Sequence, residues 1–275
     1  MGWNEITSGV FSRSYPQDEI TVTVVRGDLG LLLVDTGGSP AIAATIRSDL
    51  RELGELRCVV NTHAHYDHTF GNQVFGPDIP IYGHHLLSAH LDEYERPRLA
   101  AWRSDASREP ARDWGDVAIT SPNHLITERT WVDLGAPVEL IPLSPGHTDG
   151  DLVIRVPSRR DGGVDTWIVG DILEHPGPPM YGSGCYPMQW PETLSALLAE
   201  MGEGDVILPG HGLPLSHGAA LLQLSVLQST ASLIRKHYNA GDGLEQTLSR
   251  PGDWAYPPEA LHLAIERGYF ELENP

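Results

Sequence analysis

The segment that most constrains the fold of this chain is an apolar run that leads directly into a cluster of histidines. Residues 57–61 read Arg-Cys-Val-Val-Asn, and residues 63–68 read His-Ala-His-Tyr-Asp-His. The apolar run predicts a buried strand, so four potential ligands would leave the sheet together at one edge. Imidazole and carboxylate groups in one place suit Zn²⁺, Fe²⁺ or Mn²⁺. We therefore expect a metal site at the end of this strand.

Three later segments repeat the arrangement of an apolar run followed by a potential metal ligand. A glycine stands beside each of these ligands and lets the backbone approach closely. One such residue alone would be an ordinary cap or surface group, but three of them after the first cluster indicate a common site. They are His147 after the run 137–142, Asp171 after the run 166–170 and His211 after the run 206–208.

Hydrophobic periodicity predicts short strands, with helices between and after them. Strands are expected at 20–26, 30–35, 57–61, 79–82, 124–127, 130–134, 137–142, 151–156, 166–170 and 206–208. Helices are expected at 40–53, 85–103, 191–201, 217–239 and 257–267. Two β-rich halves that each bring helices predict two mixed sheets face to face, with the helices outside. The polar segment 103–122 is interpreted either as an inserted lid or as a solvated connector.

Charge and composition limit the classes of molecule that this chain is expected to bind. The 275 residues include 18 Lys and Arg against 37 Asp and Glu, which gives a net charge of −19. Such a field repels phosphate backbones and anionic carriers, so we expect no nucleic-acid partner and favour neutral or cationic small-molecule substrates. No apolar run reaches the length of a membrane span, and no signal peptide is recognised. The two cysteines, Cys58 and Cys185, suit reduced thiols, so a cytoplasmic location is expected.

The ordered set of ligands resembles that of the metallo-β-lactamase superfamily. The resemblance covers about residues 20–215, and it includes Asp-Thr-Gly at 35–37 and Asp-Gly-Asp-Leu at 149–152. It implies the α/β class and a four-layer αβ/βα sandwich of two mixed sheets with flanking helices. Residues 1–215 would then form the catalytic domain, and residues 216–275 a helical extension packed on the same domain.

The same resemblance implies a dinuclear metal site. Two divalent ions about 3.5–4 Å apart can share a hydroxide and lower its pKa toward neutrality. Zn²⁺ is the expected ion, with Fe and Mn as alternatives. One ion would be held by His63, His65 and His147, the other by Asp67, His68 and His211, with Asp171 bridging both.

The expected activity is hydrolysis of a small acyl substrate, which means a lactone, ester, thioester or amide. Asp67 is the expected catalytic residue, because a carboxylate that binds one ion through a single oxygen can orient the nucleophile. Substrate contacts are expected from Tyr66 and from the aromatic, Met-bearing loop after Asp171. The candidates in that loop are Met180, Tyr181, Tyr186 and Trp190, and His175 is a further residue of interest.

Two other activities stay open. A persulfide dioxygenase of the same superfamily would use a single iron, held here by His63, His147 and Asp171. A true β-lactamase usually has cysteine or serine in place of Asp171, so this sequence favours the other hydrolases. Metal analysis would separate the first alternative from a dinuclear hydrolase.

The predicted helix 217–239 carries more leucines than one buried face requires. It would therefore either cover the site or pack against another subunit. A homodimer is a further expectation from this pattern.

Overall fold

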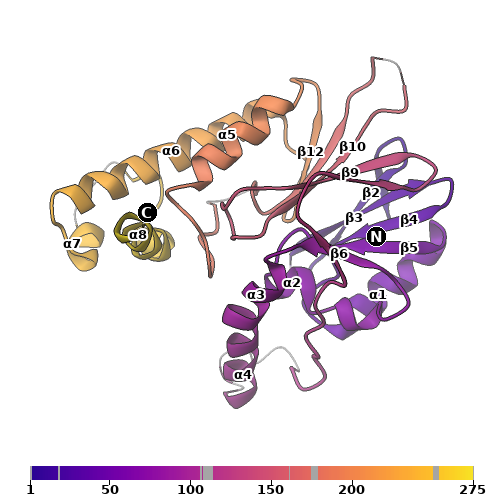
Figure 1. The fold of residues 1–275 in the computed structure, drawn as a ribbon, viewed down its shortest axis with the longest axis horizontal. Helices are drawn as coiled ribbons and strands as arrows, with labels where there is room; N and C mark the ends of the chain where they lie inside the picture. The colour runs from indigo at the N-terminus through magenta and orange to yellow at the C-terminus, as the bar shows by residue number, and fades with distance from the viewer. Residues whose placement is uncertain are drawn as a thin grey trace.

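The structure is a computed structural model that describes residues 2–17, 19–105, 107, 114–160, 162–174, 179–249 and 254–274. It contains two mixed β-sheets packed face to face, with helices on both outer surfaces. Figure 1 shows α1 (Pro40–Asp49) on one side of the sheets and α5 (Trp190–Glu200) with α6 (His217–Asn239) on the other. The predicted α/β sandwich of two mixed sheets with flanking helices is confirmed.

The first sheet contains seven strands in sequential order. Strands β1 to β4 pair antiparallel, whereas β4 to β7 pair parallel. Parallel pairing brings the carboxyl ends of β4, β5 and β6 to one edge, and the histidine cluster follows β5 there. The strands are β1 Asn4–Thr7, β2 Val10–Tyr15, β3 Ile20–Gly27, β4 Gly30–Val34, β5 Leu56–Val60, β6 Ile81–His84 and β7 His124–Ile126.

The second sheet contains five strands in the order β12-β11-β10-β9-β8. Strands β8 to β11 pair antiparallel, and β11 pairs parallel with β12. The carboxyl ends of β11 and β12 therefore lie side by side, and Asp171 and His211 follow them. The strands are β8 Thr130–Asp133, β9 Pro137–Pro142, β10 Leu152–Val156, β11 Thr166–Gly170 and β12 Val206–Pro209.

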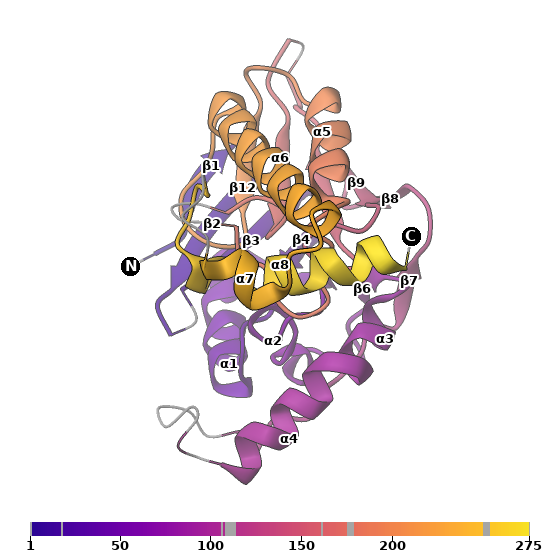
Figure 2. The same ribbon diagram turned by 90° about the vertical axis from the view of Figure 1, so that its left-hand side faces the viewer.

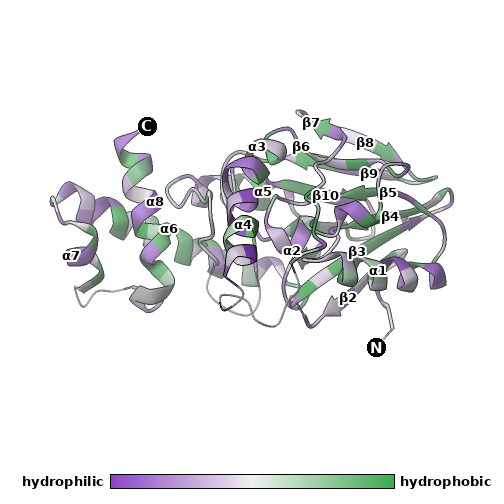
Figure 3. Cartoon of the chain, turned by 90° about the horizontal axis from the view of Figure 1, so that it is seen from below, coloured by the Kyte–Doolittle hydropathy of each residue, from purple (hydrophilic) through white to green (hydrophobic). Residues whose placement is uncertain are grey.

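Side chains that alternate along the strands fill the layers between sheets and helices. On β4, Leu32 packs between the two sheets, while Leu31 and Leu33 pack under α1. On β11, Ile168 packs between the sheets, while Trp167 packs with α5. In Figure 3 the strands are largely hydrophobic, and α7 at the periphery carries more polar residues.

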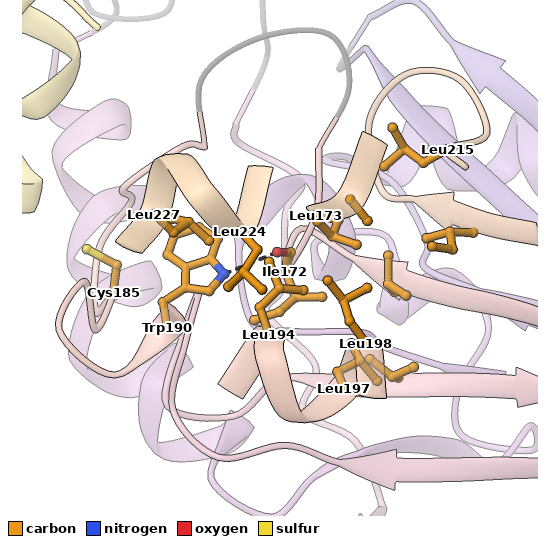
Figure 4. Packing of buried hydrophobic residues seen from close by; sticks show 14 of the residues in the cluster. Ile172, Leu173, Cys185, Trp190, Leu194, Leu197, Leu198, Leu215, Leu224 and Leu227 are labelled. Atoms are coloured by element: carbon orange, nitrogen blue, oxygen red, sulfur yellow. Dashed lines mark hydrogen bonds between the residues drawn. The ribbon is translucent and has the colours of Figure 1, made fainter. Parts of the chain in front are cut away.

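Leucines of α5 and α6 cover the outer face of the second sheet (Figure 4). They are Leu194, Leu197, Leu198, Leu224 and Leu227. Burial of each such side chain contributes about 2 kcal/mol to the free energy of folding. Trp190 is fully buried beside them, and its Nε1 donates a hydrogen bond to the carbonyl of Ile172 at 3.1 Å. Helix α6 belongs to the same core as the second sheet. The predicted boundary at residue 215 between a catalytic domain and a helical extension stays a prediction.

Two further helices, α7 (Leu244–Ser249) and α8 (Pro258–Glu273), follow α6. Helix α8 packs against α6, and Figure 2 shows it lying across the end of that helix. Leu221, Leu222 and Phe270 are exposed on α6 and α8, and the homodimer stays a prediction. None of the described helices combines the length and apolarity that crossing a bilayer requires.

The helix predicted at 85–103 is interrupted. The structure has α3 (Leu87–His90), a π-helical turn (Leu91–Glu95) and α4 (Arg96–Ser104) in its place. Pro97 has no backbone N–H to continue the hydrogen-bond ladder, which favours a break at this point. The π-helical turn matters for the site, because it ends at Glu95 and α4 begins directly after it.

Other differences concern short elements. Strands β1 and β2 were not predicted, because the polar residues Ser12, Arg13 and Ser14 hide the alternation of β2. Helix α7 was not predicted either. Of the segment 103–122, residues 106 and 108–113 lie outside the described residues. The remaining short turns are α2 Tyr66–Thr69 and two 3₁₀ turns at Leu50–Glu52 and Asn72–Val74.

Candidate metal centre

The histidine cluster occupies the turn between β5 and the short helix α2. His63 and His65 precede this helix, whereas Asp67 and His68 lie on it. The hydroxyl of Thr69 donates hydrogen bonds to the carbonyls of Ala64 and His65, which ties the helix back onto the turn. The four ligand side chains therefore leave the strand end toward one point.

The first triad consists of His63, His65 and His147. Nδ1 of His65 lies 3.1 Å from Nε2 of His63 and 2.9 Å from Nε2 of His147. All three side chains are buried. With zinc–nitrogen distances of about 2.0–2.1 Å, the ligands of a tetrahedral ion lie about 3.3 Å apart. The spacing of these nitrogens is close to that value, so the triad fits a metal ion.

The second triad consists of Asp67, His68 and His211. Oδ2 of Asp67 lies 3.1 Å from Nε2 of His211 and 3.7 Å from Nε2 of His68. The two imidazole nitrogens are 3.3 Å apart. His211 is the most open of these side chains, with 22% of its surface exposed. This triad combines carboxylate and imidazole, so it also fits a divalent ion.

Asp171 lies between the triads. Its Oδ2 is 3.6 Å from Nε2 of His63 in the first triad and 3.3 Å from Nε2 of His68 in the second. Its Oδ1 is buried and has no hydrogen-bond partner among the described residues. A buried carboxylate oxygen is costly unless something compensates its charge, and cations held by the two triads would do so. A Cβ at Gly210 would stand 2.1 Å from this Oδ1, so only glycine allows the close approach.

Asp35 supports both triads from behind. Its Oδ2 accepts hydrogen bonds from Nδ1 of His68 and from the hydroxyl of Thr62, both at 2.8 Å. The oxygen of that hydroxyl lies 3.0 Å from Nδ1 of His63. Asp35 has a φ of +65°, in the left-handed region that aspartate tolerates better than most residues. These bonds turn the Nε2 atoms of both histidines toward the site.

Backbone carbonyls orient two further rings. The carbonyl of Ser183 lies 3.1 Å from Nε2 of His65, and the carbonyl of Glu19 lies 3.1 Å from Nδ1 of His211. A proton on each outer nitrogen leaves the lone pair of the inner nitrogen available to a metal. Metal-ligating histidines are commonly held in this way.

The two triads differ in their pKa values. Burial lowers the pKa of every histidine in the first triad, and it lowers that of His147 to about 4. Burial acts in the same direction on His68 and His211, but the neighbouring carboxylates, with Asp171 foremost, outweigh it. The pKa of His68 is therefore raised well above its ordinary value, and that of His211 is raised to about 12.

A cleft of about 410 Å³ opens onto the metal centre. Asp67, Asp171 and His211 lie in its wall, so the carboxylates are accessible to a small molecule. Two of the predicted substrate residues, Tyr66 and Met180, also line this cleft.

The other predicted substrate residues lie elsewhere. Tyr181 and Trp190 are buried in the core around α5, so they support the site rather than face a substrate. The ring of Tyr186 is 5.5 Å from the guanidinium of Arg267 and does not line the cleft. His175 lies outside the described residues.

The family model for the metallo-beta-lactamase superfamily matches residues 15–211, which is more than half of the chain. The chain belongs to the metallo-β-lactamase superfamily. The predicted membership is confirmed, and the seven candidate ligand residues all lie within the matched range.

Solved and curated relatives of this superfamily member differ in length and activity. This chain is 29% identical over 159 residues to the 2,4-dinitroanisole O-demethylase subunit alpha of Nocardioides sp. (strain JS1661). The match covers 56% of this chain and 40% of the relative. A stereoselective inverting sec-alkylsulfatase from Pseudomonas sp. has a TM-score of 0.78 at 17% identity over 98% of this chain and 50% of its own. A metallo-beta-lactamase from Pontibacter korlensis has a TM-score of 0.62 at 17% identity, over 82% of this chain and 98% of its own.

Sequence reasoning missed several residues of this superfamily site. Glu19 and Ser183 act through backbone carbonyls, for which a sequence carries no signal. Arg98 lines the cleft after the π-helical turn, in a segment that reads as an ordinary helix. Asp35 belongs to the quoted 35–37 motif, but its contact with His68 joins residues that are far apart in the chain.

Both cysteines lie away from this chemistry. Cys58 is buried between the sheets and Cys185 near α5, and both are free thiols. Burial raises the pKa of each to about 12, which disfavours the reactive thiolate form.

Proposed function

We propose that this protein is a dinuclear metal-dependent hydrolase that cleaves a small acyl substrate, which means an ester, lactone, thioester or amide. One observation carries the proposal: each of the two triads places two imidazole nitrogens within 3.8 Å of a single carboxylate oxygen, Oδ2 of Asp171, at the wall of an open cleft. His63, His65 and His147 would hold one ion. Asp67, His68 and His211 would hold the other.

Two divalent ions held there would supply a hydroxide at neutral pH and would polarise the bond to be broken. Zn²⁺ is the proposed ion, and Fe or Mn would suit the same donors. The protein residues would provide the remaining functions. Asp67 lines the cleft and has Oδ2 near Nε2 of His211, so it would orient the attacking group and accept its proton.

The second triad favours this proposal over the mononuclear iron alternative. A persulfide dioxygenase would need only His63, His147 and Asp171. Here the ligand atoms of Asp67, His68 and His211 also converge, at 3.1–3.7 Å from one another, and Asp35 orients His68. The presence of this second set of converging ligand atoms supports a site for two ions.

The names of the relatives widen the set of substrates worth testing. One is an O-demethylase of 2,4-dinitroanisole, and another is a sec-alkylsulfatase. An activated ester, a lactone, a thioester, an alkyl sulfate, an aryl methyl ether and a β-lactam therefore form a suitable panel. Preference for the β-lactam would replace our proposal with a true β-lactamase.

The test combines metal analysis with one substitution. We expect about two divalent ions per chain in purified protein and hydrolysis of at least one acyl substrate. Asp67→Ala should leave the fold intact and lower turnover at least about 100-fold, because it removes both a ligand and the proton acceptor. Elemental analysis, circular dichroism and initial rates give the three readouts.

Asp28→Ala is the matched control, since Asp28 is an exposed carboxylate whose side chain is 80% accessible. Its turnover should equal that of the wild type. Unchanged activity in Asp67→Ala would contradict the proposed role of Asp67. One iron per chain with oxygen uptake on a persulfide would support the dioxygenase instead.

A further inference from the structure

Arg98 is an unexpected residue in the wall of an acidic protein's active-site cleft. Of the described residues that line the cleft, it alone is an arginine or lysine, whereas Glu19, Asp67 and Asp171 bring carboxylates. The net charge of −19 disfavours anionic substrates in general. A single guanidinium in the cleft therefore favours an anionic group at this one position, although the negative charge of the whole molecule disfavours anions.

The guanidinium of Arg98 is held in a fixed position. Its Nη2 donates a hydrogen bond to the hydroxyl of Ser183 at 2.6 Å, and its Nε lies 3.1 Å from Oε2 of Glu95. Its Cζ lies 5.6 Å from the ring centre of Trp102. Three neighbours from two segments thus remove most of the freedom of this long side chain, so little entropy is lost when it binds a ligand.

The same guanidinium keeps donors for a ligand. An arginine has five N–H groups, and Nη1 of Arg98 makes no hydrogen bond to any described residue. The side chain is 32% exposed, so a small molecule in the cleft can reach it. Its pair of terminal nitrogens has the geometry that carboxylate and sulfate groups accept.

The position of Arg98 is linked to that of the first triad. Ser183 binds Arg98 through its hydroxyl and His65 through its carbonyl. Glu95, at the end of the π-helical turn, is completely buried beneath this arrangement. The interrupted helix therefore aims Arg98 at the cleft wall beside a metal ligand.

We infer that Arg98 forms an oxyanion-binding subsite of the cleft, so that the preferred substrates carry a carboxylate or sulfate group. This inference rests on the proposed function for the position of the bond that is broken. It names the substrate class: small anionic esters or sulfate esters, in place of the neutral or cationic molecules that the net charge favours.

A merely structural alternative is that Arg98 only compensates the buried charge of Glu95. Removal of the guanidinium would then change stability, and it would affect charged and neutral substrates equally. The ratio between a matched anionic and neutral ligand therefore separates the two roles.

The test uses the metal-loaded protein and two matched ligand pairs. The first pair is the para-nitrophenyl half ester of glutaric acid and its neutral carboxamide counterpart, followed by initial rates. In the second pair a methylene replaces the ester oxygen of each compound, which gives two ketones that cannot be hydrolysed. Calorimetry measures the binding of these ketones. Para-nitrophenyl sulfate is a third substrate, and its rate is measured in the same way. It shows whether the site accepts a sulfate at the bond that is broken or only a carboxylate at the other end of the substrate.

We expect the wild type to prefer the anionic member of each pair. Arg98→Met should raise the KM and the Kd of the anionic member about 10- to 100-fold. The same constants of the neutral member should change less than about threefold. Arg98→Lys should keep part of the preference. Arg96→Met is the matched control, because Arg96 carries the same charge two residues away but pairs with the exposed Asp92.

Two outcomes overturn the inference: no anionic preference in the wild type, or a preference that survives in Arg98→Met. The calorimetric pair keeps this decision independent of turnover. Turnover without anionic preference leaves the proposed function standing and removes the subsite. Anionic preference in binding without any turnover keeps the subsite and removes the proposed hydrolysis.

Discussion

The two triads of the metal centre lie side by side, yet they are built from different chemistry. The first contains three buried imidazoles whose pKa values are lowered by burial. The second contains a carboxylate and two histidines whose pKa values are raised by neighbouring carboxylates. Without metal, the first triad offers free lone pairs at neutral pH, whereas the second holds protons. The two positions should therefore respond differently to mutation and to pH.

The largest effect is expected from removal of one ligand at a time. His147→Ala should empty the first position, and His211→Ala should empty the second, so each variant should retain about one ion per chain. The loss of affinity should exceed the 10- to 100-fold that removal of an outer-shell partner costs. Elemental analysis after dialysis measures the result. Loss of both ions from both variants would show that the positions do not fill independently.

The pH dependence of metal binding should be the next largest effect. At neutral pH a metal must displace protons from His68 and His211, because their raised pKa values keep both charged. With two protons released, affinity at the second position should rise about 100-fold from pH ~7 to pH ~8. The first position should change little, since its histidines have already lost their protons. Chelator competition at both pH values measures the affinities, and equal slopes would contradict the assigned charges.

The smallest of these effects is expected at Asp35. Asp35→Asn keeps the size of the side chain and suits a φ of +65°, but it removes the charge that faces Nδ1 of His68. Affinity at the second position should fall about 10- to 100-fold, with a smaller loss at the first position, where Asp35 acts on His63 only through the hydroxyl of Thr62. Asp149→Asn is a matched control, because Asp149 pairs with His90 at 2.9 Å rather than with a ligand. Weaker binding at the first position alone would overturn this assignment.

The two sheets, and the convergence of the seven candidate ligands, could be predicted from the sequence because their signals are local. Apolar strands such as β4 and β11 are short continuous hydrophobic runs, and each candidate ligand follows a strand in the sequence. The interruption at 91–95 could not be predicted in the same way, since Leu87, Leu91 and Leu99 are spaced as in a continuous helix. Strand β2 was missed because its consecutive polar residues Ser12, Arg13 and Ser14 interrupt the apolar pattern, although Ser12 is buried in the structure.

The supporting contacts of the site could not be predicted from local patterns at all. The pair of Asp35 with His68 spans 33 residues, and the pair of Arg98 with Ser183 spans 85. Such contacts depend on how the sheets and loops pack. For the same reason, Tyr181 and Trp190 looked like candidates for substrate contacts, although packing turns both into the core.

The aromatic stack beside the cleft gives the protein an optical property. Trp102 and Trp114 stack with ring centres 4.5 Å apart, and Tyr66 meets Trp102 edge-on at 5.0 Å. Tyr66 lines the cleft, and the guanidinium of Arg98 lies near Trp102, so a ligand entering the cleft disturbs the surroundings of this indole pair. We therefore expect ligand binding in the cleft to change the near-ultraviolet dichroism and the emission of the protein, through the Trp102–Trp114 pair among its seven tryptophans.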